Sequence, residues 1–519
     1  MHDAVPLLQD YLRHAAQRKP SKIALVCAER QVSYVDLASH AARLARALQR
    51  RGLERGDRVV IFAPNGIEAV TAFWGVLEAG AVVVMVNPLT KPEKLALLLN
   101  DCEPTALVID GALTTTFAAA AALAPSLRTV LITGTCEPVH LEGVSAVVSA
   151  DVAVAQETSG EPPARQSIDI DLATIMYTSG SCGEPKGVML THRNMLTAAS
   201  SVVEYLDLVG DDVIVNVLPL AFDYGLYQMI MSVRQCARLV LERSFGFPTE
   251  FLNLLRKEHV TVVPGVPTLF ALLTRFSERP IEGISTVRTV TSTAAPFPTS
   301  QLPSLRAMFP AARFFSMYGL TECKRCTYLP PEDLDRKPDS VGIAIPNTEL
   351  WLVDDDGQRL GANQVGELVV RGATVMQGYW GDPGATARTL RPGPLPGEQV
   401  LYTGDLCRFD DESYLYVVGR KDQVFKSRGE KVAPAAIEAV LLAVSGVREA
   451  AVVGVPDELL GNAIKAFVVL EEGSNLDENA LRRVCQKRLE SVLIPTVIQF
   501  VDSLPTTDNG KIKKQDLVV

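Results

Sequence analysis

The sequence of 519 residues lacks the charge balance of a general nucleic-acid-binding protein. Its 50 lysines and arginines are outnumbered by 60 aspartates and glutamates, and the formal net charge is −10. Proteins that bind nucleic acid without a cofactor or partner carry a basic excess, because they must neutralise phosphates. Nucleic acid is therefore excluded as the general partner.

Long apolar runs and a disulfide framework are also absent. The longest apolar runs, residues 79–86 and 118–124, are far shorter than the roughly 18–20 residues that cross a bilayer. The first twenty residues contain no continuous apolar stretch like that of a secretory signal. Nine cysteines, an odd number spread over a long chain, indicate free thiols. We therefore expect a soluble, cytoplasmic protein without a membrane span.

What the sequence does contain is an alternation of apolar strands and amphipathic helices. Residues 22–28, 57–63 and 81–87 are typical of buried strands, and residues 33–52 have the spacing of an amphipathic helix that ends at Gly52. Strands joined by helices of this length predict crossover connections and a largely parallel sheet. A helix with Leu7, Leu8 and Leu12 on one face is expected at the N-terminus.

The pattern of apolar and turn residues changes near Asp355, where β-hairpins are expected. It changes again after Lys421, where a compact mixture of helices and strands is expected to begin. We predict an α/β protein. Its large N-terminal domain, residues 1–421, has parallel and mixed sheets with helices and a β-rich subdomain. Its small, mobile α+β C-terminal domain comprises residues 422–519.

Residues 177–192, YTSGSCGEPKGVMLTH, concentrate hydroxyls, glycines and one lysine. The stretch is not a P-loop of the GxxxxGK[ST] type, because Lys186 is followed by Gly187. Glycines allow backbone N–H groups to point at an anion, and hydroxyls and a lysine add donors and positive charge. A surface turn is the alternative interpretation. We predict a phosphate-binding loop formed by Thr178, Ser179, Gly180, Ser181, Gly183 and Lys186.

Five further motifs follow the loop: MYGLTE (317–322), GELVVRG (366–372), YTGD (402–405), GRKDQVFKSRGEKV (419–432) and NGKI (509–512). Together, in this order, the six motifs resemble those of the adenylate-forming superfamily of acyl-CoA synthetases, stand-alone adenylation enzymes and luciferases. The similarity covers nearly the whole chain. The motifs are most similar to those of stand-alone amino-acid or acyl adenylating ligases that act on carrier proteins. One departure is Cys182, which stands where the family usually carries a hydroxyl.

The resemblance implies a reaction in two steps. A carboxylate attacks the α-phosphate of ATP to give an acyl-adenylate and pyrophosphate, and a pantetheine thiol then displaces AMP. Preorganised donors and cations would stabilise the negative charge on the phosphoryl oxygens. Glu322 would hold Mg²⁺, a cation that prefers oxygen ligands. The catalytic residues that the resemblance implies are Lys511, Glu322, Thr321 and Lys186.

The resemblance also assigns the nucleotide site. Asp405 would accept the ribose hydroxyls, Arg420 would support the ribose or a phosphate, and Tyr318 would flank the adenine. Asp422 falls at the family's hinge, about which the C-terminal domain would rotate between the two half-reactions. Besides the phosphate loop, the predicted nucleotide-binding residues are Ala294, Ala295, Pro296, Tyr318, Gly319, Asp405 and Arg420.

The acid pocket is less clearly defined by the resemblance. Asp223 stands where amino-acid-activating members carry the aspartate that pairs with a substrate amine; alternatively, it caps a helix that begins at Tyr224. Lys324 and Arg325 would bind a second carboxylate, or they would neutralise pyrophosphate. The implied substrate is a small amino acid, with a β-amino acid and an aspartate-like diacid among the candidates. The predicted pocket residues are Phe222, Asp223, Tyr227, Gly265, Ser292, Thr293, Met317, Lys324 and Arg325.

The thiol acceptor stays open at this point. A free-standing acyl carrier protein acting in trans is the first expectation, because no carrier domain is seen before Val519. Coenzyme A is the alternative, and the chain would then be an acyl- or aryl-CoA ligase.

Three functions of different classes are weighed against a ligase. A kinase or ATPase, which would release ADP, is disfavoured by Gly187 after the loop lysine. A non-catalytic nucleotide sensor would tolerate the loss of Lys511 or Glu322, and it is disfavoured because both are present. A luciferase-like oxidation stays open because a fold does not fix its chemistry, although no pocket residue indicates it.

Overall fold

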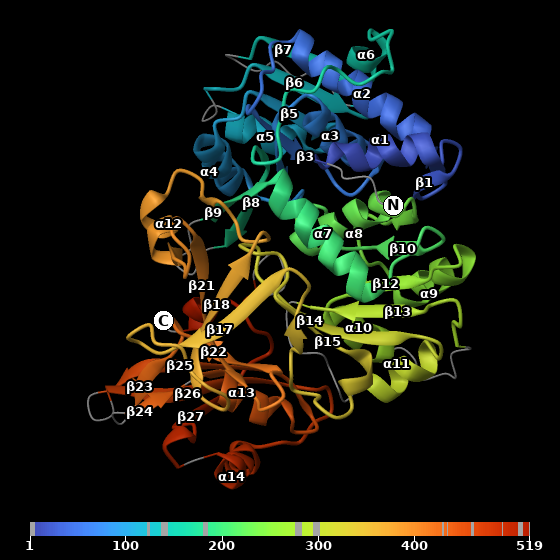
Figure 1. Ribbon diagram of the computed structural model, residues 1–519. Coiled ribbons are helices and arrows are strands. Elements are labelled where there is room, and N and C mark those ends of the chain that lie inside the picture. The colour runs from blue at the N-terminus through green and yellow to red at the C-terminus, as the bar shows by residue number, and fades with distance from the viewer. Residues whose placement is uncertain are drawn as a thin grey trace. The chain divides into compact units, whose positions relative to one another are not determined.

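The computed structural model describes residues 6–121, 125–135, 144–179, 185–275, 283–293, 301–427, 430–432, 434–457, 461–489, 491–506 and 512–517. The chain divides into two compact units. One comprises Met1–Leu350 and Val370–Leu401, and the other comprises Trp351–Val369 and Tyr402–Val519. Figure 1 shows the elements in chain order, from blue at the N-terminus to red at the C-terminus.

The first unit contains a nine-stranded sheet. Its strands are β1 (Ile23–Cys27), β2 (Arg30–Ser33), β10 (Val213–Asn216), β11 (Arg238–Leu241), β12 (Val262–Gly265), β13 (Thr289–Ser292), β14 (Arg313–Tyr318), β15 (Thr327–Leu329) and β16 (Ile343–Ala344). They lie in the order β16-β15-β14-β13-β12-β10-β11-β1-β2. Pairing is parallel from β14 to β1, and the edge strands β2, β15 and β16 are antiparallel.

An eight-stranded sheet in the same unit carries the predicted phosphate loop. Its strands are β3 (Arg58–Phe62), β4 (Val82–Val86), β5 (Ala106–Asp110), β6 (Thr129–Thr133), β7 (Ala146–Ser149), β8 (Leu172–Ser179), β9 (Pro185–Thr191) and β19 (Gly378–Tyr379). They lie in the order β19-β9-β8-β4-β3-β5-β6-β7, parallel from β8 to β7. Both large sheets are therefore mainly parallel, which confirms the prediction of a largely parallel sheet.

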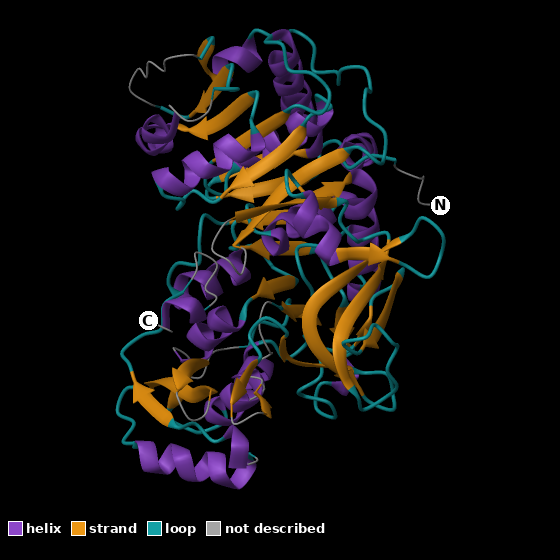
Figure 2. Cartoon of the chain, turned by 90° about the vertical axis from the view of Figure 1, so that its left-hand side faces the viewer, coloured by secondary structure: helices purple, strands orange, loops and turns teal. Residues whose placement is uncertain are grey.

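Helices lie against the strands of both large sheets (Figure 2). In the first unit they are α1 (Gln9–Arg18), α2 (Tyr34–Arg50), α3 (Ile67–Glu78), α4 (Pro92–Cys102), α5 (Thr114–Ala121), α6 (Ala150–Ala155), α7 (His192–Leu206), α8 (Asp223–Arg234), α9 (Pro248–Lys257), α10 (Pro267–Arg275), α11 (Leu302–Met308) and α12 (Pro383–Thr389). Within the described ranges, no helix combines the length and the apolar character that a membrane span requires.

Local sequence signals explain where α2 begins and ends. The Ser33 hydroxyl accepts a hydrogen bond from the backbone N–H of Asp36, which caps the first turn. Gly52 has a φ of +85°, a left-handed conformation that glycine adopts without strain after a helix. The helix predicted over residues 33–52 is thus confirmed. At the N-terminus, however, Leu7 and Leu8 are buried just before α1 instead of lying within it.

The expected β-rich segment is a five-stranded sheet formed by β17 (Thr348–Val353), β18 (Val365–Gly372), β20 (Leu390–Pro392), β21 (Gln399–Phe409) and β22 (Leu415–Arg420). The chain passes from one unit to the other within β17, β18 and β21. The predicted domain boundary between Lys421 and Asp422 stays a prediction, and the compact units group residues 402–421 with the C-terminal residues.

The tail has the expected mixture of helices and strands. It comprises β23 (Phe425–Ser427), β24 (Glu430–Val432), β25 (Val447–Asp457), β26 (Gly461–Leu470), β27 (Val497–Phe500), α13 (Pro434–Leu442) and α14 (Glu478–Arg488). Ile437 of α13 and Leu481 of α14 belong to one buried cluster with strand residues Val452 and Val468. Burial of these apolar side chains stabilises the tail as a core of its own.

Asn65 ties the two large sheets together inside the first unit. It follows β3, and its side-chain amide donates to the carbonyls of Leu218 and Glu242 at 2.9 Å each. Its side-chain oxygen accepts from the backbone N–H of Leu220, also at 2.9 Å. Leu218 and Leu220 lie in the segment that leads from β10 into α8, so this buried amide fixes the start of α8.

We expect Asn65→Ala to lower the free energy of unfolding by about 3 kcal/mol, because two buried backbone groups and one partly buried carbonyl lose their partner. Chemical denaturation followed by circular dichroism measures the change. Asn100→Ala, at an exposed position of α4, is the matched control and should change stability by less than about 0.5 kcal/mol. Equal effects of the two substitutions would contradict the role of Asn65.

Candidate functional site

The predicted phosphate loop connects two antiparallel strands. Thr178 on β8 is paired with Lys186 on β9, and Ser179 with Pro185, so the ends of the loop are held in register. Gly180, Ser181 and Gly183 lie outside the described residues. Gly187 is buried where a Cβ atom would lie 2.8 Å from a methyl of Ile175 and 3.2 Å from Cβ of Trp380. Only glycine therefore allows the segment around Trp380 to pack against this hairpin.

Tyr379 brings the loop lysine and the predicted magnesium ligand to one place. The Lys186 ammonium lies 5.2 Å from the centre of the Tyr379 ring, within cation–π range. The Tyr379 hydroxyl donates to Oε1 of Glu322 at 2.8 Å. Glu322 is further held by its carbonyl, which accepts from the backbone N–H of Met376 at 2.7 Å. Two motifs that are 136 positions apart thus meet around one side chain.

The position of Glu322 fits a magnesium ion that is shared with a nucleotide. Mg²⁺ is usually bound by one or two carboxylates, with substrate phosphates and water completing its shell. Within the described ranges, no group of three or more His, Cys, Asp or Glu side chains forms a metal site from protein ligands alone. Glu322 next to Lys186 instead offers one carboxylate beside a cation suited to phosphate. Thr321 precedes it in the same loop.

In the second unit, Arg420 binds two of the predicted residues, Asp405 and Asp422. Its Nη1 donates to Oδ1 of Asp405 and to the carbonyl of Thr403, at 3.0 Å each. Its Nε and Nη2 donate to the two carboxylate oxygens of Asp422, at 3.2 and 3.1 Å. Burial alone would lower the pKa of Arg420, but the two carboxylates raise it above its usual value. The ribose, phosphate and hinge roles of these residues stay predictions.

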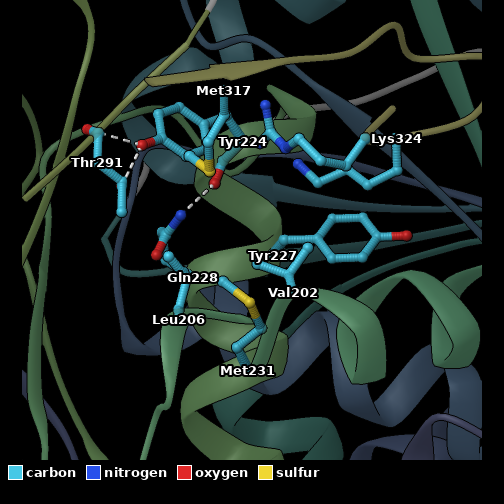
Figure 3. A pocket seen from close by; sticks show the side chains of 10 residues that line it. Val202, Leu206, Tyr224, Tyr227, Gln228, Met231, Thr291, Met317 and Lys324 are labelled. Carbon is cyan, nitrogen blue, oxygen red and sulfur yellow. Dashed lines mark hydrogen bonds between the residues drawn. The ribbon is translucent and has the colours of Figure 1, made fainter. Parts of the chain in front are cut away.

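A small cavity lies beside α8 in the first unit (Figure 3). The Tyr224 hydroxyl donates to the carbonyl of Thr291 at 3.0 Å, and Gln228 donates to the carbonyl of Tyr224 at 3.1 Å. These two hydrogen bonds fix the side chains of Tyr224 and Gln228 on one wall of the cavity. The residues that line the cavity are Val202, Leu206, Tyr224, Tyr227, Gln228, Met231, Thr291, Met317, Lys324 and Arg325.

Lys324 forms a buried ion pair with Asp223, whose Oδ2 lies 3.2 Å from the lysine ammonium. The ammonium also lies 4.3 Å from the centre of the Tyr227 ring. The backbone of Lys324 is left-handed, with φ at +63°, a strained conformation for lysine. Burial lowers the pKa of Lys324 to about 7, although the Asp223 carboxylate acts to raise it.

This pair changes the interpretation of Asp223. The helix-cap alternative is wrong, because α8 begins at Asp223 itself and Phe222 occupies the capping position. The carboxylate instead contacts Lys324, from a segment 101 positions away. The ammonium that the sequence assigns to a substrate is supplied here by the protein.

Arg325 is 3% exposed and lines the same cavity. Its Nη1 donates to the Thr293 hydroxyl at 2.6 Å, and its guanidinium lies 5.3 Å from the centre of the Tyr224 ring. Its Nε has no hydrogen-bond partner. In the part of the chain that the structure describes, no carboxylate pairs with it.

The cavity gathers some of the predicted acid-pocket residues and not others. Tyr227, Met317, Lys324 and Arg325 line it, and Asp223 reaches it through Lys324. Ser292 does not, because side chains alternate along β13 and that of its neighbour Thr291 takes the cavity side. Phe222, Gly265 and Thr293 are not among the lining residues. Ala294, Ala295, Pro296 and Lys511 lie outside the described residues.

Two residues that contribute to these sites, Tyr379 and Thr291, were not predicted from the sequence. Tyr379 sits in the segment QGYW, which has no motif of its own, and it reaches Glu322 only because β19 pairs with β9. Thr291 is an ordinary strand residue that binds the Tyr224 hydroxyl. A tyrosine next to a conformationally free glycine, Gly378 with φ at +147°, is the only local signal that the segment offers.

The sequence matches the AMP-binding enzyme family over residues 12–380 and the AMP-binding enzyme C-terminal domain over residues 436–511. The chain belongs to the AMP-binding enzyme family and is an AMP-forming acid–thiol ligase. The predicted membership of the adenylate-forming superfamily and the predicted fold class are confirmed.

Among curated relatives, a long-chain-fatty-acid–CoA ligase of Bacillus subtilis (strain 168) is 29% identical, covering 98% of this chain and 94% of the relative. A 4-coumarate–CoA ligase of Solanum tuberosum is 31% identical, covering 94% and 89%. Among solved structures, ATP-bound MatB from Rhodopseudomonas palustris is 28% identical with a TM-score of 0.87, covering 98% of both chains. The O-succinylbenzoate coenzyme A synthetase MenE of Bacillus subtilis, with ATP and a magnesium ion, is 27% identical with a TM-score of 0.84, covering 98% of both.

We expect the pH dependence of stability to report the buried ammonium of Lys324. Unfolding returns its pKa from about 7 to about 10.5, so the unfolded chain binds more protons between these values. The contribution of Lys324 to stability therefore rises as the pH is raised, by about 1.4 kcal/mol per pH unit. Between pH 7 and 9, the wild type should gain about 2–3 kcal/mol relative to Lys324→Met.

Denaturant unfolding of both proteins at pH 7, 8 and 9 measures this difference. Lys257→Met is the matched control, since its side chain is 60% exposed at the end of α9. Its stability curve should run parallel to that of the wild type. A parallel curve for Lys324→Met as well would show that this ammonium is not buried in the folded protein.

Proposed function

We propose that this enzyme activates a carboxylic acid with ATP and transfers the acyl group from AMP to the thiol of coenzyme A. The observation that carries the proposal is the meeting of Lys186 and Glu322 at Tyr379, which brings a cation and a carboxylate from two motifs to one nucleotide site. The relatives support coenzyme A as the acceptor, because three of the four described above are coenzyme A ligases or synthetases by name.

The residues of this chain have distinct roles in the proposed reaction. Lys186 and the hydroxyls of Thr178 and Thr321 bind phosphate oxygens and stabilise the charge that develops as the substrate carboxylate attacks. Lys511 orients the carboxylate and the α-phosphate. When bound, Mg²⁺ would neutralise phosphate charge, with Glu322 as its protein ligand.

The role proposed for Asp405 is to accept the ribose hydroxyls. Arg420 would hold its carboxylate in place, which is supported by the 3.0 Å hydrogen bond between the two side chains. An acyl carrier protein as acceptor, and a small amino acid as substrate, remain the predictions made from sequence. The amino-acid interpretation has lost its main support, because the Asp223 carboxylate already has an ammonium partner.

The proposed function predicts AMP and pyrophosphate as products. We expect the purified enzyme, given ATP, Mg²⁺, coenzyme A and a panel of carboxylic acids, to release AMP and pyrophosphate in equal amounts with an acyl-CoA. Chromatography of nucleotides and thioesters measures all three. Release of ADP would contradict the reaction type, and thioester formation only on a phosphopantetheinyl carrier protein would contradict the acceptor.

We expect Asp422→Pro to separate the two half-reactions, because proline fixes φ at the proposed hinge. ATP–pyrophosphate exchange should persist, while thioester formation should fall at least about 100-fold. Asp422→Ala is the matched control: it removes the same carboxylate from Arg420 but leaves the backbone free, so both half-reactions should persist. Equal loss of both half-reactions in the proline variant, or no loss of either, would contradict the hinge.

A further inference from the structure

We infer that the acid activated by this enzyme carries a second anionic group, and that Arg325 binds this group in the cavity beside α8. The inference rests on the proposed function, since it concerns the same acid. It assigns the class of substrate, a dicarboxylic acid, and replaces the amino acid expected from sequence.

Arg325 lines the cavity without a carboxylate partner among the described residues. The nearby carboxylate of Asp223 is held by Lys324, at 3.2 Å. The aromatic neighbours supply no negative charge, since burial raises the pKa of Tyr224 to about 12 and that of Tyr227 well above its usual value. A buried cation is costly when no anion accompanies it, so an anionic ligand at this place is stabilised.

The hydrogen bonds of Arg325 leave part of its donor capacity unused. A guanidinium has five N–H donors in one plane. Nη1 donates to Thr293 and the guanidinium also interacts with the Tyr205 side chain, whereas Nε is buried and has no partner. The free N–H of Nε can donate to an oxygen of a carboxylate, and a hydrogen bond between two charged groups is among the stronger ones.

The occupied carboxylate disfavours a substrate ammonium. An ammonium at Asp223 would compete with the side chain of Lys324, which already lies 3.2 Å from Oδ2 of Asp223. It would also enter a cavity that the guanidinium of Arg325 lines, and like charges in a buried site destabilise one another. A second carboxylate on the substrate has the opposite effect, because it supplies the anion that Arg325 lacks.

The lining of the cavity limits the character of the spacer between the two carboxylates. The walls away from the charges are apolar or aromatic, and they suit an aliphatic or aromatic spacer. The apolar and aromatic lining residues are Val202, Leu206, Tyr224, Tyr227, Met231 and Met317.

The test compares each dicarboxylic acid with its own ω-amide, which has nearly the same shape but no second charge. The panel runs from four to eight carbons and includes aromatic diacids. In ATP–pyrophosphate exchange, we expect kcat/KM of the best diacid to exceed that of its ω-amide by at least about 100-fold. A wild type that uses the ω-amide or a monocarboxylic acid equally well would overturn the inference.

Variants assign the preference to Arg325. In Arg325→Gln the preference for the diacid should fall at least about 100-fold, mainly through KM, and Arg325→Lys should restore part of it. The matched control is Arg306→Gln, an arginine that is 45% exposed on α11 and paired with Asp335, and it should keep the full preference. Retention of the full preference in Arg325→Gln would show that another residue binds the anion.

A binding measurement separates this inference from the proposed function. Without ATP, the preferred diacid should raise the melting temperature of the wild type, and its ω-amide should not. If no acid supports pyrophosphate exchange, the proposed function fails, whereas selective stabilisation by diacids would still support the anion site. Equal stabilisation of the wild type by diacids and ω-amides would contradict an anion site in the cavity. This result does not depend on whether Arg325→Gln folds.

Discussion

The buried ion pair between Lys324 and Asp223 determines how charge is distributed in the acid cavity. It neutralises the one carboxylate there, and it leaves the guanidinium of Arg325 to face the cavity without an anion. Removing either partner would leave an isolated buried charge, which a protein tolerates poorly. The pair therefore constrains the local structure and, under the proposed function, the kind of acid that the cavity accepts.

The segment between β14 and β15 connects this cavity with the proposed nucleotide site. Glu322 contacts Tyr379, and Lys324, two positions later in the chain, contacts Asp223. Gly319 permits the segment to fold back on itself, since a Cβ atom there would lie 2.8 Å from Cα of Arg325. Cys323 and Cys326, both buried with their sulfurs 3.2 Å apart, anchor it in the core as small apolar groups. The residues proposed to bind the acid and the nucleotide thus lie next to one another in one short loop.

Much of the fold could be predicted from the sequence, because it depends on local patterns. Apolar strands separated by amphipathic helices indicated the parallel sheets, and Ser33 and Gly52 marked the ends of α2. The motifs located Lys186 and Glu322. The partners of these residues could not be predicted, since they come from pairing between distant segments: Tyr379 through β19 and β9, and Lys324 through the left-handed turn that directs it to Asp223. Strand alternation likewise turned Ser292 away from the cavity.

The most direct test of this account is a double-mutant cycle on the ligand-free enzyme, with Asp223→Asn, Lys324→Met and the double variant. Unfolding free energies at pH 6.5, where the lysine is largely charged, give the coupling between the two side chains. A buried ion pair predicts a favourable coupling of about 2 kcal/mol or more. A coupling near zero would show that Asp223 is not held by Lys324, and the carboxylate would then be available to a substrate ammonium.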